Sequence, residues 1–168
     1  MIYLETNLTE IATIATDKQT ENENFRAFLT RKNSQKIDEL VFEINNQVTP
    51  KIDCTQCGNC CKSFMINVSL PEAEQLATHL QIDTKQLKEK YLEESLQGNL
   101  IMKSIPCSFL KENKCTIYNY RFSGCREFPH LDRPNFTDRL FGTLTFYATC
   151  PIIFNVVEEL KIQVGFKL

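Results

Sequence analysis

The feature that most constrains this chain is a run of four cysteines within eight residues, Cys54-Thr-Gln-Cys57-Gly-Asn-Cys60-Cys61. A two-residue gap between cysteines lets the chain curl so that both thiolates face one ion, and the small Gly58 permits the backbone turn that this needs. Two such steps in succession place three sulfurs on one side of a short segment. The spacing therefore predicts that Cys54, Cys57 and Cys60 bind a common metal ion.

The adjacent pair Cys60-Cys61 needs a separate interpretation. Neighbouring side chains usually diverge, and binding both to one ion would strain the peptide between them. We therefore expect the two thiols to serve different ends: either two metals, or one metal and one wall of the core. In the second case Cys61 is a small buried hydrophobic residue.

Four more cysteines lie downstream, at Cys107, Cys115, Cys125 and Cys150. Cys107 and Cys115 flank the predicted turn 111–114, so a hairpin would bring them together. Eight thiolates would fill two tetrahedral zinc sites. One iron–sulfur cluster with four cysteine ligands, plus a second site or free thiols, fits equally well. Spacing alone does not choose between zinc and iron.

Three basic residues stand close in sequence to these cysteines: Lys62, Arg121 and Arg126. A zinc ion with four thiolates carries a net charge of about −2, which nearby cations can offset while donating hydrogen bonds to sulfur. We expect this role for the three side chains, and ordinary surface charge is the alternative.

Composition narrows the class of protein. The chain has 168 residues, of which 42% are hydrophobic and 24% charged, the balance of a globular protein. Its net charge of −2 argues against nucleic acid as a partner. The first residues do not resemble a secretory signal, and the apolar stretches are too short to span a membrane. We therefore expect a cytoplasmic protein, where clustered thiols indicate metal ligation or redox chemistry rather than structural disulfides.

The pattern of apolar residues predicts a helix-rich α+β fold, a small single domain with short strands or a hairpin organised around a cysteine metal cluster. Between Phe25 and Val48, apolar residues recur at three- and four-residue steps, which is typical of helices with one buried face. We expect residues 1–50 to form a helical region that packs on a cysteine-cluster domain, residues 51–168. A protein partner that docks on these helices is the alternative role.

Several local signals predict where elements begin. Helix starts are expected at Asn7 with Glu10, at the capping box of Ser69 with Glu72, at Asp83 with Gln86, and at Cys150-Pro151. Residues 64–70 and 100–104 are expected to form short strands, residues 106–118 a tight hairpin, and residues 54–61 a loop.

Four motifs resemble, in order, those of the CxxCxxCC family, the YkgJ-type cysteine-cluster proteins. They are Cys54-x-x-Cys57-Gly-x-Cys60-Cys61, Pro106-Cys107-Ser-Phe-Leu110, Cys115-Thr-Ile-Tyr118 and Tyr120-Arg121-x-x-x-Cys125-Arg126-x-Phe128-Pro129. The resemblance runs from about Asp53 to Pro151 and implies that these cysteines chelate zinc or iron. Related domains in proteins that resemble flagellin lysine methylases imply a link to methyl transfer or iron–sulfur chemistry. The family usually has proline at the position of Phe122 in this chain. This departure bears on what the resemblance implies for the backbone before Cys125, and not on Cys125 as a ligand.

Three functions are compatible with these features. The first is a metal-binding protein that holds zinc or iron for structure, storage or delivery and is not an enzyme on its own. The second is an iron–sulfur or zinc enzyme of redox or group-transfer type, although the chain lacks a glycine-rich nucleotide loop, a Ser/His/Asp set and an HExxH motif. The third is a thiol redox protein using Cys60-Cys61 or Cys54/Cys57, which leaves six cysteines unexplained.

Overall fold

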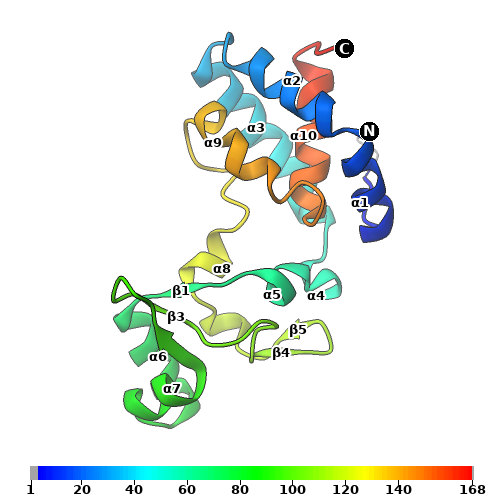
Figure 1. Ribbon diagram of the computed structural model, residues 1–168. Coiled ribbons are helices and arrows are strands. Elements are labelled where there is room, and N and C mark those ends of the chain that lie inside the picture. Colours follow the sequence, from blue (N-terminus) through cyan, green and yellow to red (C-terminus); the bar gives the residue numbers. More distant parts are fainter. Residues whose placement is uncertain (1–3, 168) are drawn as a thin grey trace. The chain divides into compact units, whose positions relative to one another are not determined.

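The computed structural model describes residues 4–167 and divides the chain into two compact units (Figure 1). The residues up to Asp53 and those from Pro129 onward form one unit, here called the helical unit. Residues Cys54–Phe128 form the other, here called the cysteine unit. The structure is 59% helical and 7% strand, so the helix-rich α+β class predicted from the sequence is confirmed.

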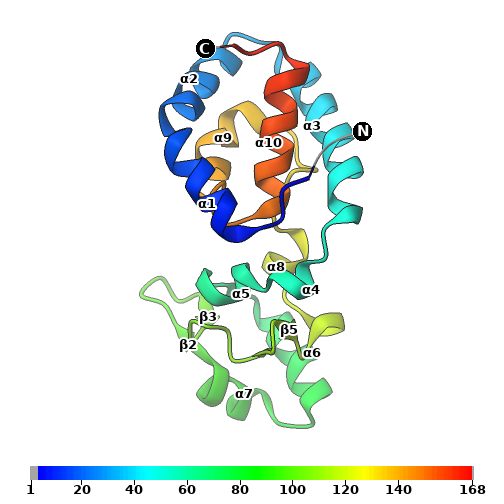
Figure 2. The same ribbon diagram turned by 90° about the vertical axis from the view of Figure 1, so that its right-hand side faces the viewer.

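The helical unit consists of α1 (Leu8–Asp17), α2 (Gln19–Leu29), α3 (Ser34–Val48), the 3₁₀ helix η1 (Thr49–Lys51), α9 (Phe136–Leu144) and α10 (Pro151–Gln163). Figure 2 shows α10 surrounded by α1, α2, α3 and α9. Every residue from Pro151 to Val157 is buried. These first two turns are apolar except for Asn155, and a helix segment of this kind is stable in water only when other elements cover its sides. Pro151 occupies the first helical position, as predicted.

The helices predicted before residue 50 are present, and their apolar stripe is buried, including Phe25, Leu29, Val41 and Ile44. This stripe packs against α9 and α10, which the expected division at residue 50 assigned to the cysteine-cluster domain. The structure groups these elements together because α3 alone would leave its buried face in water. The division into residues 1–50 and 51–168 stays a prediction.

Helix α9 has no local start signal, and the sequence did not predict it. Its N-cap residue Asn135 has a left-handed backbone (φ 59°) and makes no capping bond with its own side chain. Asp38 of α3 supplies the cap instead, because its two carboxylate oxygens accept the N–H groups of Asn135 and Phe136, each at 2.8 Å. A cap that comes from about a hundred residues away leaves no signature in the local sequence.

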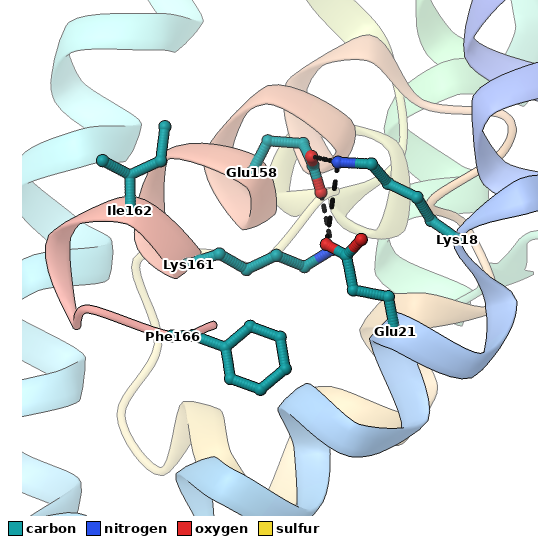
Figure 3. Close-up of a pocket in the computed structure, with 6 residues that line it drawn as sticks. All are labelled: Lys18, Glu21, Glu158, Lys161, Ile162 and Phe166. Atoms are coloured by element: carbon teal, nitrogen blue, oxygen red, sulfur yellow. Dashed lines mark hydrogen bonds and ion pairs between the residues drawn. The ribbon is translucent and has the colours of Figure 1, made fainter. Parts of the chain in front are cut away.

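A cluster of opposite charges joins α10 to the start of α2 (Figure 3). The side chain of Lys161 is only 5% exposed, and its Nζ donates to Glu21 at 2.8 Å and to Glu158 at 2.7 Å. Glu158 also accepts hydrogen bonds from Lys18 and, at 2.7 Å, from the Tyr147 hydroxyl. Each buried charge in the cluster therefore has an opposite partner, which is the condition for tolerating charge in a protein interior.

The cysteine unit contains seven of the eight cysteines, six of them in short helices and strands and Cys107 in the segment before β4. Its elements are α4 (Cys54–Cys57), α5 (Asn59–Ser63), β1 (Asn67–Val68), α6 (Leu70–Leu80), α7 (Thr84–Tyr91), β2 (Leu92–Glu94), β3 (Leu100–Met102), β4 (Leu110–Lys111), β5 (Lys114–Cys115), η2 (Tyr118–Tyr120) and α8 (Ser123–Glu127). Strand β3 is central and pairs antiparallel with β1 and β2, so that Ile101 lies opposite Asn67 on one side and Glu93 on the other. The core of this unit contains Val68, Leu76, Leu87, Met102, Phe109, Ile117 and Phe122.

The predicted helix starts in this unit are confirmed, since Ser69 with Glu72 and Asp83 with Gln86 both form capping boxes. Helix α7 ends at Tyr91, because Leu92 begins β2 with its side chain buried. The expected strand 64–70 shrinks to the two residues of β1, and 100–104 to β3. No helix among residues 4–167 has the length and apolar character that a membrane crossing requires.

Candidate metal centre

The four-cysteine run forms two short helical turns, α4 and α5, where the sequence predicted a loop. Gly58 separates them with a φ of +57°, and its N–H donates to the Cys54 carbonyl at 3.0 Å. A Cβ at this position would lie 3.1 Å from the carbonyl oxygen of Asn113. Glycine is therefore required for two reasons: the left-handed backbone, and the close approach of the hairpin to this segment.

The predicted hairpin is confirmed and consists of β4 and β5, with Leu110 opposite Cys115. Its two turn residues, Glu112 and Asn113, have φ values of 50° and 62°, the pair of positive values that a tight two-residue turn requires. Just before the hairpin, the Cys107 N–H donates to the Cys61 carbonyl at 2.8 Å. This bond ties the segment that carries Cys107 to the adjacent pair in α5.

Helix α8 carries Cys125 and packs against β1. A Cβ at Gly124 would already be in van der Waals contact with Ile66, 3.4 Å away, so a small residue lets α8 lie close to that segment. The side chains of Cys107, Cys115 and Cys125 are all partly buried against the core of the cysteine unit. Three separate segments thus bring cysteines to one side of the same core.

Neighbouring cysteines, among them Cys107 and Cys115, act on the pKa of Cys60, Cys61 or Cys125, so these thiols lie close together. The thiols of Cys60 and Cys61 are hydrogen-bonded to each other, so the adjacent side chains do not diverge as the sequence argument assumed. This bond is the main cause that lowers the pKa of Cys60 to about 6, against the opposing effect of burial. The same bond, followed by burial, raises the pKa of Cys61. The two neighbours therefore differ in how readily they ionise, although their side chains share a hydrogen bond.

The half-buried thiols of Cys107 and Cys125 resist ionisation mainly because burial disfavours the thiolate, and also because other cysteines are close. Burial, followed by the charges of Cys107, Cys60 and Cys115, raises the pKa of Cys125 to about 12. Burial also raises the pKa of Cys107, although the amides of Phe109 and Leu110 donate to its sulfur and oppose the shift. A divalent cation reverses this balance, because a thiol that coordinates a metal ion is deprotonated. Chemically, the group is a set of closely spaced sulfur donors.

The three basic residues have different surroundings. Arg121 places its guanidinium 3.9 Å from the centre of the Tyr118 ring, and its charge helps to lower the pKa of Cys60 and opposes the rise in the pKa of Cys125. Arg126 donates to the Arg121 carbonyl and lies 4.0 Å from Glu72. Lys62 reaches the Cys57 carbonyl at 3.5 Å. Of the three, Arg121 is the one whose charge is shown to act on the thiols.

The other three predicted ligands lie elsewhere. Cys54 is exposed and Cys57 half-buried in α4, while Cys150 is buried as the N-cap of α10 in the helical unit. Among residues 4–167, no three metal-ligating side chains are close enough to hold one ion as they stand. Binding of one ion by Cys54, Cys57 and Cys60 therefore stays a prediction, as does a ligand role for Cys150.

The order of the cysteine segments matches one known family model. The model is CxxCxxCC, described as "Putative zinc- or iron-chelating domain", and it matches residues 53–151. The chain belongs to the CxxCxxCC family. The CxxCxxCC match contains all eight cysteines together with Arg121 and Arg126, and it ends at the first residue of α10. No solved structure matches the chain significantly.

Sequence reasoning missed two contacts that hold the CxxCxxCC segments together. One is the packing of Asn113 on Gly58, and the other is a hydrogen bond from the Ser123 N–H to the Glu72 carboxylate at 2.5 Å. Each joins residues more than fifty positions apart. Glu72 was recognisable as a helix cap, but nothing local signals its second partner.

Proposed function

We propose that this protein binds zinc or iron through a thiolate centre supplied by α5, the β4–β5 hairpin region and α8. Its ligands would be Cys60, Cys61, Cys107, Cys115 and Cys125, with Cys54 and Cys57 of α4 completing the set. The observation that carries the proposal is the packing of Cys107, Cys115 and Cys125 against one core, with Cys107 bonded to the backbone of Cys61. The pKa shifts of Cys60, Cys61 and Cys125 by nearby cysteines, and the charge of Arg121 beside Cys60 and Cys125, agree with this geometry. Membership of a family described as zinc- or iron-chelating supports the same function.

The residues of the site fit such a metal. Thiolates are soft ligands that suit zinc and iron–sulfur clusters. The buried Nε of Arg121 has no hydrogen-bond partner among the described residues, and a buried donor without a partner is costly. The thiolates of a metal centre are negatively charged, and they could accept a hydrogen bond from this donor. Arg121 is close enough for this, since its charge already acts on Cys60 and Cys125. When bound, zinc in four thiolates supplies rigidity and an iron–sulfur cluster supplies electron transfer.

The test is metal content after purification without oxygen, measured with acid-labile sulfide and the visible absorption spectrum. Stoichiometric zinc in a colourless sample identifies a zinc centre, whereas iron with sulfide and a brown colour identifies an iron–sulfur cluster. Cys60→Ser, Cys107→Ser and Cys125→Ser should each lose metal. A parent protein without zinc or iron, or full metal content in Cys107→Ser and Cys125→Ser, would refute the proposal. Cys150→Ser tests the remaining predicted ligand separately.

We propose that the centre holds metal for structure, storage or delivery. We also propose that the protein does so in the cytoplasm. A reducing compartment keeps clustered thiols available for ligation. Uptake that is reversible by a competing chelator, without loss of the fold, supports storage or delivery. Loss of the fold together with the metal supports a structural role.

A further inference from the structure

Glu72 sits at a junction between two helices of the cysteine unit. One carboxylate oxygen accepts the N–H and the hydroxyl of Ser69, at 3.0 and 2.6 Å, and so closes the capping box of α6. The other oxygen accepts the N–H of Ser123, the first residue of α8, at 2.5 Å. The same oxygen lies 4.0 Å from Arg126, which belongs to α8 as well. A single carboxylate therefore holds the start of one helix and two residues of another.

Helix α8 depends on such an outside contact because it is very short. It has five residues, Ser123–Glu127, and its N-cap residue Phe122 has no side-chain oxygen to offer. Isolated helices of this length are unstable in water, since the cost of fixing the first turn is not recovered. Cys125 lies in the middle of this helix. What fixes α8 therefore also fixes the Cys125 thiol relative to the other cysteines.

We propose that Glu72 is a positioning residue of the metal centre, which holds Cys125 in place by anchoring α8 to the start of α6. The proposal rests on the proposed function, in which Cys125 is a ligand, and extends it to a residue outside the cysteine motifs. Glu72 touches no cysteine in these contacts, and it acts through Ser123 and Arg126.

The ionisation of Glu72 agrees with this geometry. Burial alone would raise its pKa, but hydrogen bonds from Ser69 and Ser123 outweigh burial and lower the pKa to about 2. Glu72 is thus a carboxylate throughout the neutral range, and each oxygen acts as an acceptor. Glutamine in its place would turn an NH₂ group toward the N–H of either Ser69 or Ser123. One of the two anchors would then be lost while the size of the side chain is kept.

The experiment compares Glu72→Gln with two controls on the same segment, the N-cap variant Ser69→Ala and the exposed-face variant Glu74→Gln. Ser69→Ala weakens the cap of α6 but leaves the bond from Ser123 to Glu72 intact. In a competition with a chelator for zinc, we expect Glu72→Gln to bind metal about 10-fold more weakly than the parent, as for other residues that orient ligands. Both controls should stay within about 2-fold of the parent, well below the effect expected for such residues.

A second measurement makes the inference independent of metal binding. The metal-free proteins are treated with iodoacetamide, and the alkylation rates of Cys125 and Cys107 are followed by mass spectrometry. We expect Glu72→Gln to raise the rate at Cys125 several-fold while Cys107 reacts as in the parent. Equal rates at Cys125 in variant and parent, or rates that rise together at both cysteines, would overturn the positioning role. Selective labelling of Cys125 in a protein that takes up no metal would support the anchor and refute the metal-binding function.

Discussion

Arg121 illustrates at the scale of one residue how surroundings separate a functional cation from ordinary surface charge. Its guanidinium lies on the Tyr118 ring, its carbonyl accepts from Arg126, and its charge acts on Cys60 and Cys125. The sequence placed Arg121, Arg126 and Lys62 in one class because each is near a cysteine. Only the folded arrangement separates them, since side-chain direction depends on contacts that sequence distance does not encode.

Replacing Arg121 should weaken the metal centre. We expect Arg121→Ala to lower affinity for zinc by about 10- to 100-fold, because thiolate charge would lose its nearest compensating cation. Arg121→Lys should recover part of the loss, since it restores charge without the planar fork. The measurement is zinc retention against a chelator, with Lys85→Ala as a control that removes an exposed charge from the same unit. Equal zinc retention in Arg121→Ala and the parent would show that Arg121 is an ordinary surface charge.

Glu158 makes the stability of the protein depend on pH. Burial disfavours its charge, but hydrogen bonds from Lys161, Lys18 and Tyr147 outweigh burial and lower its pKa below the ordinary value. Its contribution is thus complete above the unfolded carboxyl pKa, near 4.3, and is lost as pH falls through the lowered folded pKa. We expect Glu158→Gln to reduce the free energy of unfolding by about 2 kcal/mol at pH 7.

The measurement for Glu158 is urea unfolding at several pH values between 3 and 7. The difference in the free energy of unfolding between the parent and Glu158→Gln should shrink toward acid pH. At acid pH the parent loses the charged carboxylate that the variant lacks at every pH. Glu159→Gln, at the next position on α10, is the matched control and should change stability by less than about 0.5 kcal/mol. A constant difference across the pH range would contradict the assignment to this carboxylate.

At the scale of elements, the sequence was informative wherever an element carries its own start or turn signal. The capping boxes of α6 and α7, the first-turn Pro151 and the hairpin turn at residues 112–113 were all readable. Helices α8 and α9 could not be predicted from local sequence, because their anchors lie in distant segments. Glu72 anchors α8, and Asp38 caps α9. The candidate site followed the same rule. The four-cysteine run was visible as a motif, but its contact with the Asn113 turn was not.

Gly58 joins α4 to α5 where the hairpin comes closest, so its substitution should affect both elements. We expect Gly58→Ala to destabilise the protein by about 1–2 kcal/mol, since alanine must adopt a positive φ and its Cβ meets the Asn113 backbone. Metal retention should fall as well. Gly98→Ala is a matched control, because Gly98 also has a positive φ, of 79°, but its Cβ would meet only the Glu94 side chain at 3.7 Å. Thermal unfolding and metal content of the two variants should differ accordingly.

At the scale of the whole molecule, the two units should respond differently to metal removal. The core of the helical unit is built from aliphatic and aromatic side chains of α1–α3, α9 and α10. Seven of the eight cysteines lie in the cysteine unit. Because metal binding energy in small metal domains is partly folding energy, a chelator should loosen the cysteine unit first.

Hydrogen–deuterium exchange of the metal-loaded and chelated protein measures this difference. We expect faster exchange after chelation in α4, α5, the β4–β5 hairpin and α8, and unchanged protection in α10. Protection of α10 reports the global stability of the helical unit, since its first seven residues are buried. Equal loss of protection in α10 and α5 would mean that the metal supports both units.

The helical unit takes its helices from both sides of the cysteine unit in the sequence, and this order matters during translation. The ribosome makes α1–α3 first, then every residue of the cysteine unit, and only afterwards α9 and α10. At about 5–20 residues per second, the forty residues from Pro129 to Leu168 take on the order of seconds to synthesise. During that interval the cysteine unit is already synthesised, while α3 still lacks the helix that covers its apolar face. If the proposed function is right, the cysteine segments are therefore available for a metal before the helical unit is complete.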